Sequence, residues 1–210
     1  MMKIICHRGY WKAAGEKNTP IAFTRSFSMG FGTETDVRDC DGLLVISHDM
    51  PKASAMTLKN YLDDLARFQR RDLIQAINIK SDGLSTALAK QMSACAHPWF
   101  VFDMSVPDLI QHIRAGNPCF ARMSEYENFP AQLAGQIKGI WLDAFNSTWY
   151  STGVIQNLLD QNLQVCVVSP ELHGRPDHED LWRALRSIPQ SENLILCTDF
   201  PEAAQSLISA

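Results

Sequence analysis

Residues 7–49 contain two histidines, an arginine and a pair of carboxylates, side chains with which proteins bind divalent metals and cut phosphodiesters. The carboxylates, Glu34 and Asp36, are two positions apart, and the flanking Thr33 and Thr35 favour a β-strand, so both side chains leave the same face. Oxygen ligands suit hard cations, so the pair predicts a site for Mg²⁺ or Ca²⁺ rather than Zn²⁺. The alternative is a solvated strand edge.

The two histidines, His7 and His48, are candidates for acid and base. An imidazole titrates near neutral pH and can take either role. One would accept a proton from the attacking hydroxyl, and the other would protonate the departing alkoxide. Cys6 is a weaker candidate nucleophile, because neighbours on a strand point to opposite faces.

Asn78 and Lys80 repeat the spacing of the carboxylates on a later strand-like run. The amide of Asn78 can offer a neutral oxygen to the same metal, and Lys80 can offer a positive charge to a phosphate oxygen. The alternative for Lys80 is an ordinary surface lysine. We expect Lys80 to be functional because it stands at the end of an apolar strand.

Residues 169–175 follow the seventh apolar run, where a substrate-binding loop would lie. Glu171 and His173 in this segment are therefore predicted to contact the substrate. The remaining histidines are expected to be structural: His97, His112 and His178.

Short apolar runs alternate with amphipathic segments along the whole chain. The predicted strands are 3–7, 32–37, 73–80, 99–103, 118–122, 138–143, 163–169 and 193–199. The predicted helices are 19–30, 57–70, 83–95, 106–115, 128–135, 151–161, 178–188 and 201–209.

This alternation predicts a parallel sheet, and eight units favour a single (β/α)8 TIM barrel over an open doubly wound sheet. Residues 43–47 form a further run after an Asp-Gly turn, which predicts a β-hairpin extension after the second strand. Polar residues cluster at the carboxyl ends of the strands, the face on which a barrel places its active site. Asp103 and Asp199 at these ends have a simpler alternative, as helix caps.

The composition indicates a globular chain that we expect to form one domain, residues 1–210. A formal net charge of -4 and a single adjacent basic pair argue against nucleic acid as a partner. No long apolar run predicts an integral membrane contact, and the N-terminus lacks the apolar core of a secretory signal, so a cytoplasmic location is expected. The six scattered cysteines are predicted to be reduced thiols rather than disulfides or zinc ligands.

The chain resembles the glycerophosphodiester phosphodiesterases, a family of phospholipase-C-like barrel enzymes. The motifs that carry the resemblance are His7-Arg8-Gly9, Asn18-Thr19, Glu34-Thr35-Asp36, Asp41-Gly42 and His48-Asp49. Weaker similarity continues through Asn78-Ile79-Lys80 to Thr198-Asp199-Phe200-Pro201. The resemblance implies His7 and His48 as the acid and base, Glu34 and Asp36 as metal ligands, and Arg8, Asn18 and Lys80 as ligands of the substrate.

Three features depart from the family pattern. Asn78 stands where the family usually has glutamate, and Lys17 stands where a glutamate usually precedes the Asn-Thr pair. The short stretch between His48 and the third strand leaves no room for the usual capping insertion, so glycerol specificity is not implied. Segments 102–105, 124–127 and 169–174 are similar to a compact bacterial subgroup of these barrels.

The sequence therefore predicts a metal-dependent phosphodiester hydrolase that acts on a small phosphodiester. Two alternatives follow from Asn78 and the missing cap: a catalytically weak protein that binds a phosphoryl ligand, and a lyase or phosphotransferase that releases a cyclic phosphate. The sequence indicates neither the substrate nor the oligomeric state.

Overall fold

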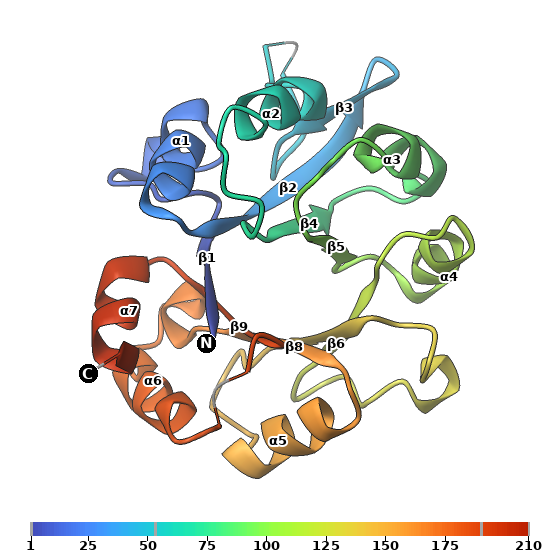
Figure 1. The fold of residues 1–210 in the computed structure, drawn as a ribbon. Helices are drawn as coiled ribbons and strands as arrows, with labels where there is room; N and C mark the ends of the chain where they lie inside the picture. Colours follow the sequence, from blue (N-terminus) through green and yellow to red (C-terminus); the bar gives the residue numbers. More distant parts are fainter. Residues whose placement is uncertain (1, 53, 190, 210) are drawn as a thin grey trace.

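A computed structural model describes residues 2–52, 54–189 and 191–209 and shows a barrel of eight parallel strands within a ring of helices (Figure 1). The strands follow the order β5-β4-β2-β1-β9-β8-β7-β6. All eight predicted runs are confirmed, as β1 Lys3–His7, β2 Gly32–Cys40, β4 Gln75–Ile79, β5 Trp99–Phe102, β6 Phe120–Met123, β7 Gly139–Leu142, β8 Gln164–Val168 and β9 Leu194–Thr198.

Seven of the predicted helices are confirmed in the described part of the chain, on the outside of the barrel. They are α1 Pro20–Met29, α2 Leu58–Leu65, α3 Ser85–Met92, α4 Val106–Arg114, α5 Thr152–Asp160, α6 His178–Arg186 and α7 Pro201–Ser209. The helix predicted over 128–135 is wrong, since only the 3₁₀ turn Ala131–Leu133 forms there. Pro130 lacks the N–H that would continue a helix, and Gly135 turns the chain with a φ of 81°, so too few residues remain between them.

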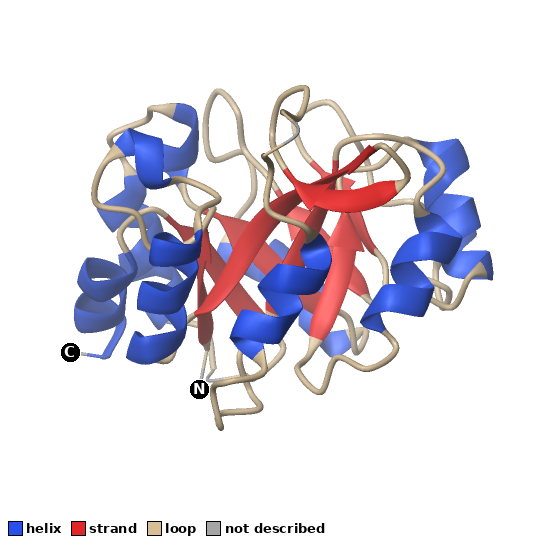
Figure 2. Cartoon of the chain, turned by 90° about the horizontal axis from the view of Figure 1, so that it is seen from above, coloured by secondary structure: helices blue, strands red, loops and turns tan. Residues whose placement is uncertain are grey.

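The predicted hairpin is confirmed, with β3 Leu43–Ile46 antiparallel to β2. Asp41 and Gly42 both have positive φ, 50° and 79°, as the tight turn between the strands requires. Figure 2 shows this two-stranded extension projecting beyond one end of the barrel. It positions the segment after β3, which contains His48.

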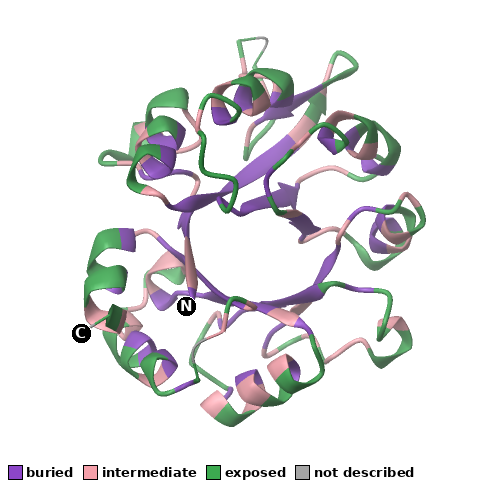
Figure 3. Cartoon of the chain, in the orientation of Figure 1, coloured by how far each residue is buried: buried purple, intermediate pink, exposed green. Residues whose placement is uncertain are grey.

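Buried residues lie along the strands and on the barrel-facing sides of the helices (Figure 3). Most of the buried apolar side chains form two layers that stabilise the barrel. The larger layer fills the space between the strands and the helices, and the smaller one fills the lumen. The lumen residues are Ile5, Ile74, Ala76, Phe100, Phe102, Phe120, Trp141, Cys166, Val168, Ile195 and Cys197. Their alternation with outward-facing residues along each strand follows from the two-residue period of β-structure.

The seam between β5 and β6 is the weakest join of the barrel. The backbones meet at one parallel bridge, Val101 to Cys119, and Phe100 stacks on Phe120 with ring centroids 3.7 Å apart. Burial of these rings closes the barrel where few ladder hydrogen bonds do. Trp141 on β7 is buried in the same layer and stacks on Phe102 with ring centroids 3.8 Å apart.

All six cysteines are free, as predicted. Burial raises the pKa of the Cys6 thiol to about 12, so it stays protonated and is a poor nucleophile. Among the described helices, none combines the length and the apolar character needed to cross a bilayer.

Candidate active site

The site begins where β1 and β2 lie side by side, with His7 and Glu34 as partners in the parallel register. The chain turns sharply after His7, and the backbone N–H of Arg8 donates to Oε2 of Glu34 over 3.0 Å. Gly9 makes the turn possible: its φ is 79°, and an added Cβ would lie 2.8 Å from that of Ala22. The His-Arg-Gly motif thus brings the Arg8 side chain over the β2 carboxylates.

Asp36 is the centre of the cluster and is fully buried. Its Oδ2 accepts a hydrogen bond from Nδ2 of Asn18 over 2.7 Å and lies 3.0 Å from Nε of Arg8. The Lys80 ammonium lies 3.5 Å from its Oδ1. Thr35 holds Asn18 in place by donating to its Oδ1 over 2.8 Å. The structure therefore brings together five of the predicted site residues at the carboxyl ends of β1, β2 and β4, namely Arg8, Asn18, Glu34, Asp36 and Lys80.

Asn78 on β4 is the register partner of Asp36 on β2 and is also buried. Within the described residues, no group donates a hydrogen bond to Oδ1 of Asn78 or to Oδ1 of Asp36, and the Lys80 ammonium lies 3.5 Å from the latter. Buried oxygens that accept no hydrogen bond are costly unless a cation satisfies them. This pair of oxygens, beside the second carboxylate of Glu34, has the donor chemistry of a site for a hard divalent cation.

The electrostatics of the carboxylate pair also favour a divalent cation at this position. Burial, and then repulsion from Asp36, raise the pKa of Glu34 to about 7. The positive charges of His7, Arg8 and Lys80 offset only part of this effect. A strand that holds two buried carboxylates side by side is thus electrostatically strained, and a divalent cation would relieve the strain.

His7 is oriented by a residue that the sequence prediction did not include in the site. Nδ1 of His7 lies 2.8 Å from Oδ1 of Asp199, and the same oxygen accepts from Nε1 of Trp11 over 3.1 Å. With Nδ1 engaged, Nε2 is the ring nitrogen left for proton transfer. The position of Asp199 in the sequence could have indicated its role. It follows the last strand, and a closed barrel places that strand beside β1.

A chain of ion pairs runs from the cluster around the barrel mouth. Lys80 lies 3.5 Å from Asp103, and Arg122 lies 2.6 Å from the same carboxylate. Asp103 is not the cap of α4, because Ser105 accepts the hydrogen bond of that helix start. Among the described non-glycine residues with positive φ, three belong to this mouth, Arg8 at 56°, Asn18 at 59° and Asp103 at 71°. Backbone strain of this kind concentrates at functional sites.

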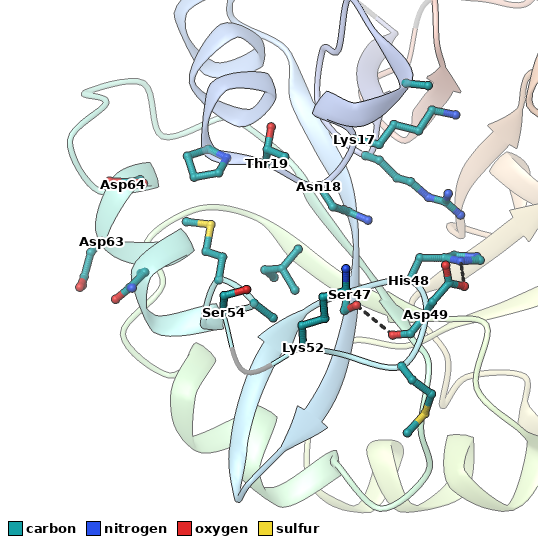
Figure 4. Close-up of a pocket in the computed structure, with 18 of the residues that line it drawn as sticks. Lys17, Asn18, Thr19, Ser47, His48, Asp49, Lys52, Ser54, Asp63 and Asp64 are labelled. Atoms are coloured by element: carbon teal, nitrogen blue, oxygen red, sulfur yellow. Dashed lines mark hydrogen bonds and ion pairs between the residues drawn. The ribbon is translucent and has the colours of Figure 1, made fainter.

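His48 lies in the segment after β3, beside Ser47 and Asp49 (Figure 4). Its Nδ1 is 2.9 Å from Oδ1 of Asp49, and its side chain is 42% exposed. It lines a cleft of about 1010 Å³ together with Arg8 and Asn18. The two predicted acid/base histidines thus come from different parts of the chain, His7 from the end of β1 and His48 from the segment after the hairpin, and their joint action on one substrate remains a prediction.

Glu171 and His173 are not among the residues that contact Asp36. Glu171 accepts hydrogen bonds from Ser169, from Thr198 Oγ1 over 2.5 Å and from the backbone N–H of Asp199 over 3.0 Å. His173 lies 2.6 Å from Asp143. Both are at the barrel mouth, and their predicted contact with substrate remains a prediction.

We expect Glu171→Ala to lower the free energy of unfolding by about 2 to 3 kcal/mol, because it leaves the Asp199 N–H and the Thr198 hydroxyl without their acceptor. Glu171→Gln keeps one acceptor oxygen and should recover most of this loss. Urea unfolding of the two variants measures it. A substrate ligand would give the reverse pattern, with a raised KM and little change in stability.

Comparison with known proteins supports the architecture. No family model matches the sequence, and no curated protein matches it. A structure of a glycerophosphodiester phosphodiesterase from Parabacteroides distasonis matches with a TM-score of 0.69 and 19% identity, covering 99% of this chain and 97% of that one. A glycerophosphoryl diester phosphodiesterase from the same organism gives a TM-score of 0.57 and 16% identity, over 100% and 86% of the two chains.

A Ca²⁺-dependent phosphatidylinositol-specific phospholipase C from Streptomyces antibioticus matches with a TM-score of 0.58 and 11% identity, over 99% of this chain and 95% of that one. The resemblance predicted from the motifs is therefore confirmed at the level of the fold. This chain has the barrel fold of the glycerophosphodiester phosphodiesterases and of a phosphatidylinositol-specific phospholipase C.

Proposed function

We propose that this protein is a metal-dependent phosphodiesterase that hydrolyses a small phosphodiester. The observation that carries the proposal is the buried pair Glu34 and Asp36, flanked by Arg8 and Lys80 and adjacent to His7. Such a site offers a place for a cation, charges for a phosphoryl group and a proton-transfer group within one barrel mouth. The printed activities of the structural neighbours support the same reaction class.

Glu34, Asp36 and Asn78 would hold the metal. Within the described chain, no three side chains of histidine, cysteine, aspartate or glutamate gather as a metal site, so the amide oxygen of Asn78 is needed as a third protein ligand. An oxygen set with two carboxylates suits Mg²⁺ or Ca²⁺. When bound, such an ion polarises a phosphoryl oxygen and neutralises charge that develops during bond cleavage.

The protein's own groups supply the rest of the chemistry. Arg8 and Lys80 already contact Asp36, and either can turn a donor toward a phosphoryl oxygen. His7, held at Nδ1 by Asp199, presents Nε2 for one proton transfer. His48, which lines the cleft together with Arg8, would carry out the other, since one histidine must take a proton and the other must give one.

A panel of phosphodiesters assayed with Mg²⁺ or Ca²⁺, and then with EDTA, tests the proposal. We expect metal-dependent hydrolysis that EDTA abolishes and added metal restores. Phosphorus NMR of the products separates hydrolysis from release of a cyclic phosphate. Binding of a diester that persists without turnover, and that His7→Ala leaves intact, would show a binding protein instead.

We expect Asn78→Asp to raise the affinity for the divalent cation by roughly tenfold, because metal affinity rises with the number of charged ligands. The same change should lower the melting temperature of the metal-free protein, since a third carboxylate would join two buried ones. Calorimetric titration with Ca²⁺ or Mg²⁺ and thermal unfolding in EDTA measure the two effects. Asn78→Ala, which removes the oxygen, should weaken binding; unchanged affinity in both variants would exclude Asn78 as a ligand.

We further propose that residues 1–210 act as one domain in the cytoplasm. The six unpaired thiols are compatible with a reducing compartment. Labelling of free thiols in protein isolated from its native cells tests this, with six reactive groups expected after denaturation.

A further inference from the structure

The cleft beside the metal-binding cluster is larger than a phosphodiester group needs. Its volume is about 1010 Å³, at the upper end of the range for small-molecule sites. It opens from Arg8, Asn18 and His48, so a substrate held at the cluster would extend into it (Figure 4). The cleft therefore faces the part of the substrate that lies beyond the reacting phosphorus.

Two of the acidic residues that line this cleft pair with cationic neighbours. Asp63 pairs with Lys59 over 2.7 Å, and Asp64 pairs with Arg67 over 3.3 Å. The third, Asp49, lies 2.9 Å from the ring of His48. The two paired carboxylates thus contribute little negative potential to the cleft.

Two lysines of the cleft have no carboxylate partner among the residues that the structure describes. Lys17 places its ammonium 4.4 Å from the ring centroid of Trp11, and the indole N–H of Trp11 donates to Asp199 beside His7. Lys17 is thereby kept close to the catalytic mouth. Lys52 comes from the segment after β3 and points toward the side of the cleft that Asn18 lines (Figure 4).

Positive charge without a carboxylate partner in a concave site attracts an anion. We propose that this cleft provides a subsite for a second anionic group of the substrate, attracted by the positive charges that Lys17 and Lys52 each add to the lining. The group would be a carboxylate or a phosphate monoester on the alcohol beyond the scissile phosphodiester. The inference rests on the proposed function and names its substrate class. Apolar side chains of the cleft, Ile46 and Met56, would contact the carbon chain between the two anionic groups.

Matched substrates test the subsite. Glycerophosphoserine and glycerophosphoethanolamine differ by one carboxylate, and glycerophosphoglycerol can be compared with its terminal phosphate monoester. We expect kcat/KM to be about tenfold higher for the anionic member of each pair, as one charge-assisted contact provides at a partly exposed site. The preference should weaken as ionic strength rises. A larger ratio of kcat/KM in the first pair would indicate that the subsite binds a carboxylate, and a larger ratio in the second pair would indicate a phosphate monoester.

Variants locate the effect. Lys17→Met and Lys52→Met should each lower the preference several-fold through KM and leave kcat near the wild-type value. Lys138→Met is the matched control, because Lys138 is an exposed lysine before β7 that does not line the cleft and pairs with none of its described carboxylates. The inference is overturned if the wild type has the same kcat/KM for both members of each pair. It is also overturned if both lysine variants keep the wild-type ratio.

Equilibrium binding separates this inference from the proposed function. The same compounds can be titrated into His7→Ala, which keeps the cleft. A preference for the anionic compounds that depends on Lys17 and Lys52, in a protein whose wild type hydrolyses none of them, would overturn the phosphodiesterase and leave the subsite standing. Equal binding of both members of each pair, together with hydrolysis by the wild type, would overturn the subsite and leave the phosphodiesterase standing.

Discussion

Glu34→Gln is expected to make the metal-free protein more stable while it removes metal-dependent activity. In the native chain, burial and the charge of Asp36 raise the pKa of Glu34 to about 7. The shift of this buried group from its ordinary value of 4.5 corresponds to about 3 kcal/mol of destabilisation at high pH. Glutamine removes the charge and can still accept the hydrogen bond from the Arg8 N–H.

The raised pKa of Glu34 determines how the stability of the metal-free protein changes with pH. Glu34 has a higher pKa in the folded state than in the unfolded chain, so the folded protein holds the extra proton between about pH 4.5 and pH 7. Stability of the metal-free protein should therefore fall as pH rises through this window. Above about pH 7, the full destabilisation by ionised Glu34 remains, and saturating Mg²⁺ or Ca²⁺ should offset this destabilisation.

Thermal unfolding in EDTA at pH 5 and pH 8 measures the effect. The advantage of Glu34→Gln over the wild type should be small at pH 5 and large at pH 8, and addition of metal should stabilise the wild type more than the variant. Glu192→Gln, at an exposed position, is the matched control and should show no such change. A variant less stable than the wild type at pH 8 without metal would contradict the strained-pair interpretation of β2.

The second large effect is expected at His7. His7→Ala should lower kcat by about a thousandfold or more, since a positioned acid or base contributes 10² to 10⁴ in rate. Binding of substrate should change little, because Arg8 and Lys80 remain. Steady-state kinetics and equilibrium binding measure the two quantities, and His178→Ala, in a helix far along the chain, is the control.

Asp199→Asn distinguishes proton transfer from a structural role of His7. Asparagine keeps a hydrogen-bonding group beside Nδ1 of His7 but removes the charge of the carboxylate, so kcat should fall while substrate binding changes little. An unchanged kcat in Asp199→Asn, together with a loss of less than tenfold in His7→Ala, would exclude His7 as the acid or base. His48→Ala, assayed in parallel, tests whether His48 is the second acid or base.

The sequence predicted most of the secondary structure because its signals are local. The apolar runs, the Asp41-Gly42 turn and the helix starts at Pro20 and Pro201 each act within a few residues. The failure over 128–135 has a local cause as well, because Pro130 and Gly135 leave space for a single turn. The same local period placed Glu34 and Asp36 on one face of a strand.

The sequence also contained the chemical identity of the site, but not all of its partners. The family resemblance selected Arg8 and Asn18, and the strand spacing selected Lys80; all three contact Asp36 in the structure. The sequence did not reveal that Glu171 binds Thr198 and the backbone of Asp199. Side-chain direction at a loop depends on the packing around it, and no periodic pattern encodes it.

By itself, then, the sequence determined the parallel strands, the hairpin and the carboxylate pair, because hydrophobic period and turn chemistry act over short distances. Tertiary structure decided which distant residues meet. His7 and Asp199 are 192 positions apart in the chain and pair because the barrel closes with β9 beside β1. The cleft that Lys17 and Lys52 line exists for the same reason. The residues before α1 and the segment after β3 meet at one rim only when the strands between them adopt their register.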